Sequence, residues 1–186
     1  MTGVIIAVVI IVLILLWIMS MYNSLVKARN KVRNSWSQID VQLQRRFDLI
    51  PNLVETVKGY MNHEQGTLEK IAALRTSWAS ANTVQEKAEL DNQLSGTLKT
   101  IMAVSENYPD LKANANFAKL QEDLKATEDK LSYSRQFYND TVTMYNNKLE
   151  VIPSNIIASI FNFKPEQLFK VDSEEARSNV KVSFDK

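Results

Sequence analysis

The sequence contains no cysteine, one histidine, four glycines and four prolines among its 186 residues. Without cysteine there is no disulfide, no thiolate metal site and no cysteine nucleophile. One histidine is too few for a His-rich metal cluster, and so few glycines leave no glycine-rich phosphate loop or nucleophile elbow. We therefore expect no enzymatic activity, no metal and no cofactor.

Charge is balanced overall, with 22 Lys and Arg against 21 Asp and Glu, and this balance argues against nucleic-acid binding. The first 21 residues, however, carry no charged side chain. Residues 4–21 read VIIAVVIIVLILLWIMSM, in which Ser20 is the one polar residue. A helix of this length spans about 27 Å, close to the hydrocarbon thickness of a bilayer. The sequence therefore predicts a transmembrane anchor over residues 1–21.

A cleaved signal peptide is the alternative interpretation of this segment. No Lys or Arg precedes the apolar run, which is also longer than a signal-peptide core and is followed by no small-residue cleavage site. Trp17 and Tyr22 lie where interfacial aromatic residues are expected at the end of a membrane helix. These features favour an uncleaved, single-pass anchor.

Cationic side chains follow the anchor, and no acidic residue appears before Asp40. The four cations are Lys27, Arg29, Lys31 and Arg33. The positive-inside rule then places the rest of the chain on the cytoplasmic side of the membrane. The same four side chains are candidate contacts for anionic lipid headgroups.

Apolar residues recur at steps of three and four through residues 32–61, as expected for one buried face of a long helix. They are Val32, Trp36, Ile39, Leu43, Phe47, Ile50, Val54, Val57 and Met61. We expect a continuous helix bent at Pro51. In the alternative, Pro51 lies in the first turn of a new helix capped by Asp48.

Three more amphipathic stretches follow. The first has apolar positions Leu68, Ile71, Leu74 or Arg75, and Trp78; the second has Leu90, Leu94, Leu98, Ile101 and Val104; the third has Phe117, Leu120, Leu124, Thr127, Leu131, Ser134, Tyr138, Val142, Tyr145 and Leu149. Thr83 and Glu86 form a capping-box pattern before the second stretch, which we expect to end near Tyr108 and Pro109. The sequence therefore predicts an all-α protein with an antiparallel bundle over residues 22–150.

The last segment, residues 151–186, is dense in apolar residues and broken by Pro165. We expect a short helix and an extended tail packed on the bundle, and 180–184 is the one stretch that alternates as a strand would. A contact surface for a partner, a second copy or the membrane interface is the alternative. Its residues would be Ile157, Ile160, Phe161, Phe163 and Phe169.

Polar residues cluster around the predicted bend, where Arg45 and Arg46 flank Phe47. The remaining members are Asp48, Asn52 and Glu55. Either an arginine forms an ion pair with an acid of another helix, or the cluster binds an anion or a lipid headgroup. His63 and Glu64 do not complete a zinc motif, because position 67 is Thr, so we expect His63 to be a surface or hinge residue.

Several of these segments together closely resemble the signature of the bacterial LemA family. They are Tyr22–Asn30 (YNSLVKARN), Trp36–Arg46 (WSQIDVQLQRR), Asp48–Tyr60 (DLIPNLVETVKGY) and His63-Glu64. The C-terminal pattern agrees as well, with Tyr145-Asn146, Pro153, Ala158, Phe161, Phe163, Phe169, Arg177, Val182 and Phe184. The resemblance departs at Asn162, where the family has Gly, and at Asn179, where it has Pro.

The resemblance implies a short exposed N-terminus, one membrane helix and a helical bundle in a bacterial cytoplasmic membrane. No enzymatic activity is established for the family as a whole, and one relative is associated with magnetosome membranes. Some relatives carry a lipoprotein signal in place of the anchor, which puts their domains outside the cytoplasm. We expect a non-catalytic, homo-oligomeric scaffold whose partners are the bilayer and other membrane proteins. The alternative is an adaptor or regulator of a membrane enzyme such as a protease.

Overall fold

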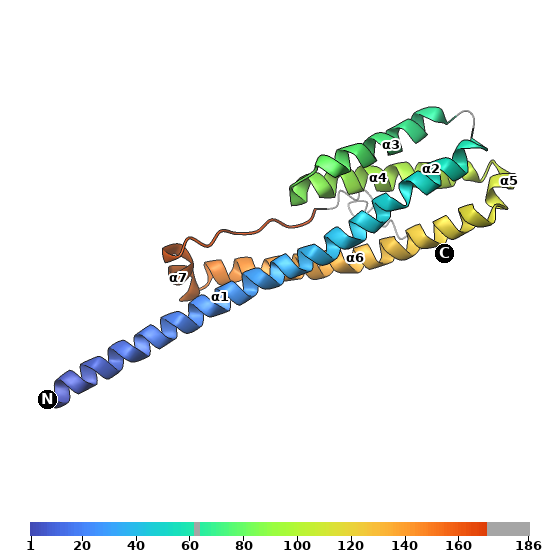
Figure 1. The fold of residues 1–186 in the computed structure, drawn as a ribbon. Coiled ribbons are helices and arrows are strands. Elements are labelled where there is room, and N and C mark those ends of the chain that lie inside the picture. The colour runs from blue at the N-terminus through green and yellow to red at the C-terminus, as the bar shows by residue number, and fades with distance from the viewer. Residues whose placement is uncertain (62–63, 171–186) are drawn as a thin grey trace, which may run out of the picture. The chain divides into compact units, whose positions relative to one another are not determined.

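The computed structural model describes residues 1–61 and 64–170. His63, Arg177, Asn179 and the alternating stretch 180–184 lie outside the described residues. The helices are α1 (Thr2–Asp48), α2 (Ile50–Lys58), α3 (Gln65–Ser80), α4 (Val84–Ser105), α5 (Pro109–Lys112), α6 (Ala115–Glu150) and α7 (Ser154–Ile160) (Figure 1). No strand occurs within the described ranges, so the predicted all-α fold with a long apolar N-terminal helix is confirmed.

The chain divides into two compact units. The first contains Met1–Leu49 and Gln121–Leu168, which are α1, most of α6, and α7 with the extended chain after it. The second contains Ile50–Leu120 and the described residues from Phe169 onward, and so holds α2 to α5 and the start of α6. Each unit is therefore built from segments that are distant in sequence.

In the first unit, α1 and α6 run antiparallel, as their polar contacts show. The Lys148 ammonium lies 2.7 Å from Ser24 Oγ, and the hydroxyl groups of Ser35 and Thr141 are 2.8 Å apart. As residue numbers rise along α1 they fall along α6, which fixes the opposite direction of the two helices. The buried apolar residues of the two helices in this unit are Leu25, Val32, Ile39, Leu43 and Phe47 of α1 and Leu124, Leu131, Tyr138, Val142 and Tyr145 of α6.

At one predicted core position on α6, the neighbouring residue is buried instead. Ser134 is only half-buried, whereas Arg135 is buried. A step of four from Leu131 reaches Arg135, and the next step of three reaches Tyr138, so the helical period allows either residue in the apolar face. Arg135 takes the position because its charge is paired inside the unit, as described below.

The long helix is interrupted two residues before Pro51. α1 ends at Asp48 and α2 begins at Ile50, while Leu49 keeps right-handed helical torsions of −76° and −19°. Pro51 therefore lies in the first turn of α2, where its missing N–H needs no helical partner. The boundary between α1 and α2 agrees with the alternative, but the helical torsions of Leu49 keep Thr2–Lys58 one helical stretch, as expected for a continuous helix. Asp48 Oδ1 accepts a hydrogen bond from Gln44 Nε2. Leu53, rather than the predicted Val54, is fully buried after this point.

In the second unit, α3 packs against α4 and α2. The buried face of α3 contains Leu68, Ile71, Leu74 and Trp78, so Leu74 and not Arg75 continues the apolar face. The predicted capping box of α4 is confirmed: Glu86 N–H donates to Thr83 Oγ1 at 3.1 Å, and Thr83 N–H donates to Glu86 Oε2 at 3.0 Å. Backbone hydrogen bonds, first from Asn82 and then from Thr83, lower the pKa of the Glu86 carboxyl.

α7 ends in a hydrogen-bonded turn that requires a left-handed residue. Phe163 N–H donates to Ala158 O at 2.9 Å and Asn162 N–H to Ser159 O at 3.1 Å, which is the Schellman arrangement. Asn162 has a φ of 54°, a conformation that Gly and Asn adopt most easily. The turn reverses the chain so that Phe163 packs against the cluster of Leu25, Ile157 and Ala158.

Candidate functional site

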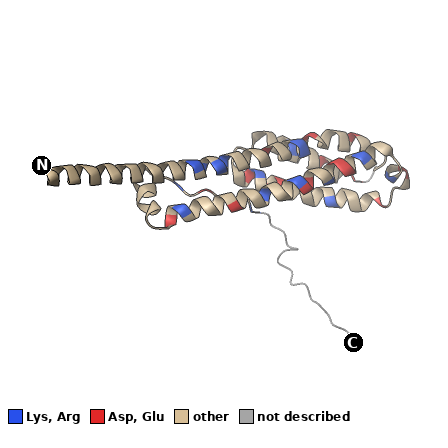
Figure 2. Cartoon of the chain, turned by 90° about the horizontal axis from the view of Figure 1, so that it is seen from below, with Lys and Arg blue, Asp and Glu red and all other residues tan. Residues whose placement is uncertain are grey.

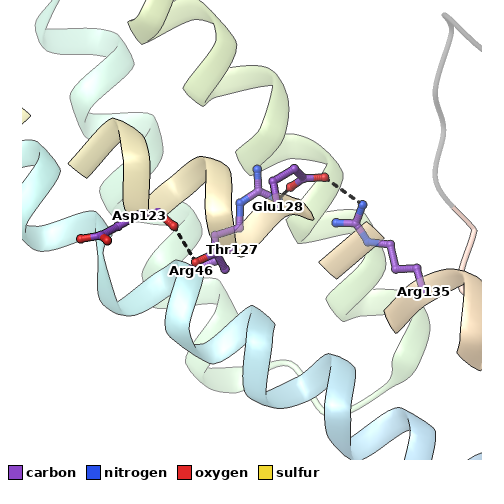
Figure 3. Close-up of polar contacts among 5 residues, drawn as sticks. All are labelled: Arg46, Asp123, Thr127, Glu128 and Arg135. Carbon is purple, nitrogen blue, oxygen red and sulfur yellow. Dashed lines mark hydrogen bonds and ion pairs between the residues drawn. The ribbon is translucent and has the colours of Figure 1, made fainter. Parts of the chain in front are cut away.

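A buried ionic cluster joins α1 to α6 in the first unit. Arg46 and Arg135 are only 4% and 9% exposed. Arg46 Nη1 lies 2.8 Å from Glu128 Oε2, and Arg135 Nη1 donates to Glu128 Oε1 at 3.2 Å. Each oxygen of one carboxylate thus meets one guanidinium, and Figure 3 shows the two arginines approaching Glu128 from α1 and from α6.

The helical spacing explains why these side chains meet. Glu128 and Arg135 are seven residues apart, which is close to two turns, so both lie on the face of α6 that meets α1. Thr127, on the same face, donates its hydroxyl to Asp123 O at 2.8 Å and so adds no charge (Figure 3). A buried guanidinium is stable only when it is paired, so Glu128 makes the burial of both arginines possible.

The structure does not bring together the polar residues that the sequence grouped around Pro51. Arg45 and Asp48 are exposed, and Asp48 Oδ1 accepts a hydrogen bond of 2.8 Å from Gln44 Nε2 on the same helix. Asn52 and Glu55 are exposed in the second unit. Within the predicted set, Arg46 alone is buried, and its partners Glu128 and Arg135 were missed by the sequence analysis. The three-and-four spacing around Leu131 was the signal that could have indicated Arg135.

Three of the four cations that follow the apolar segment have described surroundings, which lie on two sides of α1. The Arg29 guanidinium lies 5.0 Å from the centroid of the Phe163 ring, on the side of α1 that meets the extended C-terminal segment. Lys27 and Lys31 instead line a groove together with Lys148 of α6. Figure 2 shows the start of α1 without charged residues and the first cations after it. Arg29 is therefore separated from Lys27 and Lys31, and Arg33 is exposed.

The C-terminal apolar residues also divide into buried and exposed groups. Ile157 is buried against α1 with Leu25, and Phe163 is half-buried beside it. The Phe161 ring lies 4.7 Å from the Tyr22 ring, yet half of its surface is exposed. Ile160 is 68% exposed. Phe169 is buried in the second unit. The predicted contact surface of Ile157, Ile160, Phe161, Phe163 and Phe169 is therefore not one exposed surface.

Hydrogen bonds from α6 hold the extended chain that follows α7. The Tyr138 hydroxyl donates to Gln167 O at 2.8 Å and the Tyr145 hydroxyl to Lys164 O at 2.9 Å. The Asn146 amide pairs with both backbone groups of Glu166, at 2.9 and 3.0 Å. Burial, and then the charge of Glu166, raises the pKa of the Tyr138 hydroxyl to about 12. The same two causes raise the pKa of the Tyr145 hydroxyl, and the positive charges of Arg29 and Arg33 act to lower it.

In the described part of the chain, one helical stretch is long and apolar enough to cross a membrane, namely Thr2–Lys58. None of the residues in its most apolar 18-residue segment is buried. Among residues 1–61 and 64–170, no group of three or more His, Cys, Asp and Glu side chains could hold a metal ion. The features that the described residues do present are an apolar helix, a buried ionic cluster and a basic groove.

Known proteins share this sequence pattern. The model of the LemA family matches residues 35–184. Protein LemA of Metamycoplasma hominis is 26% identical over 165 residues, which cover 84% of this chain and 75% of that protein. Magnetosome proteins MamQ 1 and MamQ 2 of Paramagnetospirillum magneticum are each 24% identical over 179 residues, which cover 82% of this chain and 66% of theirs.

None of these names describes an enzyme, and the chain spans about two thirds of the length of the magnetosome proteins. The family match and the apolar first half of α1 fit a membrane-anchored helical protein. Because the family model matches most of the sequence, the chain belongs to the LemA family.

Proposed function

We propose that this protein is a non-catalytic, membrane-anchored scaffold that acts by assembling with copies of itself at the membrane. The observation that carries the proposal is the continuity of α1. Its first part is apolar and exposed, and its second part supplies Leu25, Val32, Ile39 and Leu43 to the core of the first unit. No flexible linker separates these two parts, so an anchored helix would hold the first unit at a fixed place next to the bilayer.

The exposed part of α7 supports assembly at that place. Ile156 and Ile160 of α7, and Phe161 directly after it, are exposed on a segment that packs against the end of the apolar run of α1. Adjacent apolar side chains that face outward are typical of contact surfaces. We propose that two copies meet through this part of α7. The names of the magnetosome relatives support a role in membrane organisation.

Crosslinking in membranes tests the proposal, since the chain has no native cysteine. Ile160→Cys places a single thiol on the exposed part of α7, and the matched control Ala126→Cys places one on an exposed position of α6. We expect a short bifunctional maleimide to give a dimer of the 21.2 kDa chain with Ile160→Cys and not with Ala126→Cys. A monomeric mass in nanodiscs with no crosslink at either position would contradict self-assembly.

A further inference from the structure

A groove lies along α1 and α6 at the end of the apolar segment. It has a volume of about 760 Å³, and all of its lining residues belong to the first unit. Leu16 and Met19 of the apolar segment line one part, and Met144 of α6 adds a further exposed apolar surface. The groove therefore begins on the part of α1 that would lie in lipid.

The charged side chains in the lining are all cationic. Lys27 and Lys31 are one turn apart on α1, and Lys148 comes from the antiparallel α6. No acidic residue lines the groove. The Lys148 ammonium donates to Ser24 Oγ at 2.7 Å, which fixes its position and leaves it two further donors.

This combination suits one class of ligand. Three ammonium groups attract an anion, and a phosphate ester can accept several hydrogen bonds from such groups. Leu16 and Met19 offer no partner to a free anion, but they can contact the glycerol and acyl part of a lipid. We propose that the groove binds the headgroup of an anionic phospholipid, whose acyl chains extend along the apolar segment of α1.

Of the four cations that the sequence suggested as lipid contacts, only Lys27 and Lys31 line this groove. The third groove cation, Lys148, lies on α6, far from the anchor in sequence, so the charge pattern after the anchor could not indicate it. Arg29 does not line the groove and lies over the Phe163 ring, whereas Lys31 lines the groove and its ammonium also lies 5.6 Å from the centroid of the Phe137 ring. The inference rests on the part of the proposed function that places α1 in the bilayer, but it does not require self-assembly. The oligomeric mass and the lipid binding can therefore fail separately.

Native mass spectrometry of the full chain in detergent tests the inference. The probes are dioleoyl phosphatidylglycerol, dioleoyl phosphatidylcholine as the zwitterionic control, and inorganic phosphate. We expect one phosphatidylglycerol retained per chain, with a preference over phosphatidylcholine of about tenfold or more. Lys27→Gln/Lys31→Gln/Lys148→Gln is expected to abolish that preference.

A control variant removes the same charge elsewhere: Lys58→Gln/Lys70→Gln/Lys125→Gln changes three exposed lysines outside the groove. We expect it to retain the preference. Met144→Glu, at an exposed position, adds an acid to the groove without removing a hydrogen bond and is expected to weaken phosphatidylglycerol binding. Equal loss in both lysine variants, or no preference in the native chain, would overturn the proposal. Displacement of the lipid by millimolar inorganic phosphate would contradict the acyl contact.

Discussion

At the scale of single residues, the internal charges of the first unit depend on Glu128. Its carboxylate contacts both Arg46 and Arg135, which are buried. A buried pair of this kind is weak evidence for net stability, but removing one member leaves a charge without that partner. Glu128 therefore determines whether α1 and α6 can pack with two arginines between them.

Glu128→Gln tests this dependence because it keeps the shape and removes the charge. We expect the free energy of unfolding to fall by about 1–3 kcal/mol, at the lower end because the Glu128 side chain is partly exposed. Urea unfolding in detergent measures the change. Glu122→Gln, an exposed position on α6, is the control and should change stability by less than about 0.5 kcal/mol. Equal effects of the two substitutions would contradict the role of Glu128.

The Tyr138 hydroxyl is expected to make the free energy of unfolding depend on pH in the alkaline range. Burial and the charge of Glu166 raise the pKa of its hydroxyl from 10.0 to about 12 in the folded chain. Between these values the unfolded chain has lost the proton and the folded chain has kept it, so stability falls as the pH rises. Stability from this hydroxyl is fully present below pH 10 and is lost by pH 12.

Tyr138→Phe should reduce that alkaline loss by roughly 1–2 kcal/mol. The variant also loses the hydrogen bond to Gln167 O, so it starts from a stability about 1 kcal/mol lower at pH 8. Urea unfolding at a series of pH values between 8 and 12 measures both effects. The exposed Tyr133→Phe serves as the control. An unchanged slope in Tyr138→Phe would show that this hydroxyl does not cause the loss.

At the scale of elements, the ends of the helices depend on a few side chains. Thr83 and Glu86 begin α4, Asn162 follows the end of α7, and Pro51 lies in the first turn of α2. The capping box was predictable because Thr and Glu three residues apart satisfy specific N–H groups. The break at Leu49 was not, because the apolar spacing continues through it and Leu49 itself remains helical.

Thr83→Ala removes the side-chain acceptor of the capping box. We expect a loss of about 1 kcal/mol in the free energy of unfolding, since Glu86 N–H loses its partner. Thr100→Ala is the matched control, because Thr100 is exposed within α4 and its hydroxyl donates to Gly96 O of the same helix. If thermal unfolding gave the same change for both variants, the capping box would contribute nothing to α4.

The left-handed conformation of Asn162 makes it sensitive to branching. Asn162→Val should destabilise the turn after α7 by about 1–2 kcal/mol, whereas Asn162→Gly should be neutral or slightly stabilising. Hydrogen exchange of the Phe163 amide, which bonds to Ala158 O, reports on the turn directly. Faster exchange in both variants would argue against a backbone cause.

At the scale of the whole molecule, the sequence predicted the fold class, the apolar N-terminal helix and most buried apolar positions. Periodicity identifies which residues of a helix are buried, because the apolar period follows the helical repeat. It does not identify which helices meet. The expected ion pair between an arginine and an acid of another helix is present as Arg46 with Glu128, but the sequence could not name Glu128 as the partner. The groove was missed for the same reason, since Lys148 is far from Lys27 in sequence and adjacent only after α1 and α6 pack.

The division into two units was also beyond the sequence analysis, which expected one bundle over residues 22–150. The apolar face of α1 continues into α2 at Ile50, and the apolar face of α6 includes Phe117, which belongs to the second unit. A continuous apolar face gives no sign of where one compact unit ends. Long-range contacts decide that boundary, and they depend on packing rather than on local pattern.

The side of the membrane on which the second unit lies tests the predicted anchor and its orientation. Ala73→Cys introduces one thiol at an exposed position of α3 in a chain without native cysteine. If α1 crosses the bilayer with its cations on the cytoplasmic side, a membrane-impermeant maleimide will label this thiol in lysed spheroplasts and not in intact ones. Labelling of intact spheroplasts would contradict that orientation, and release of the unlabelled protein from membranes by carbonate would contradict the anchor itself.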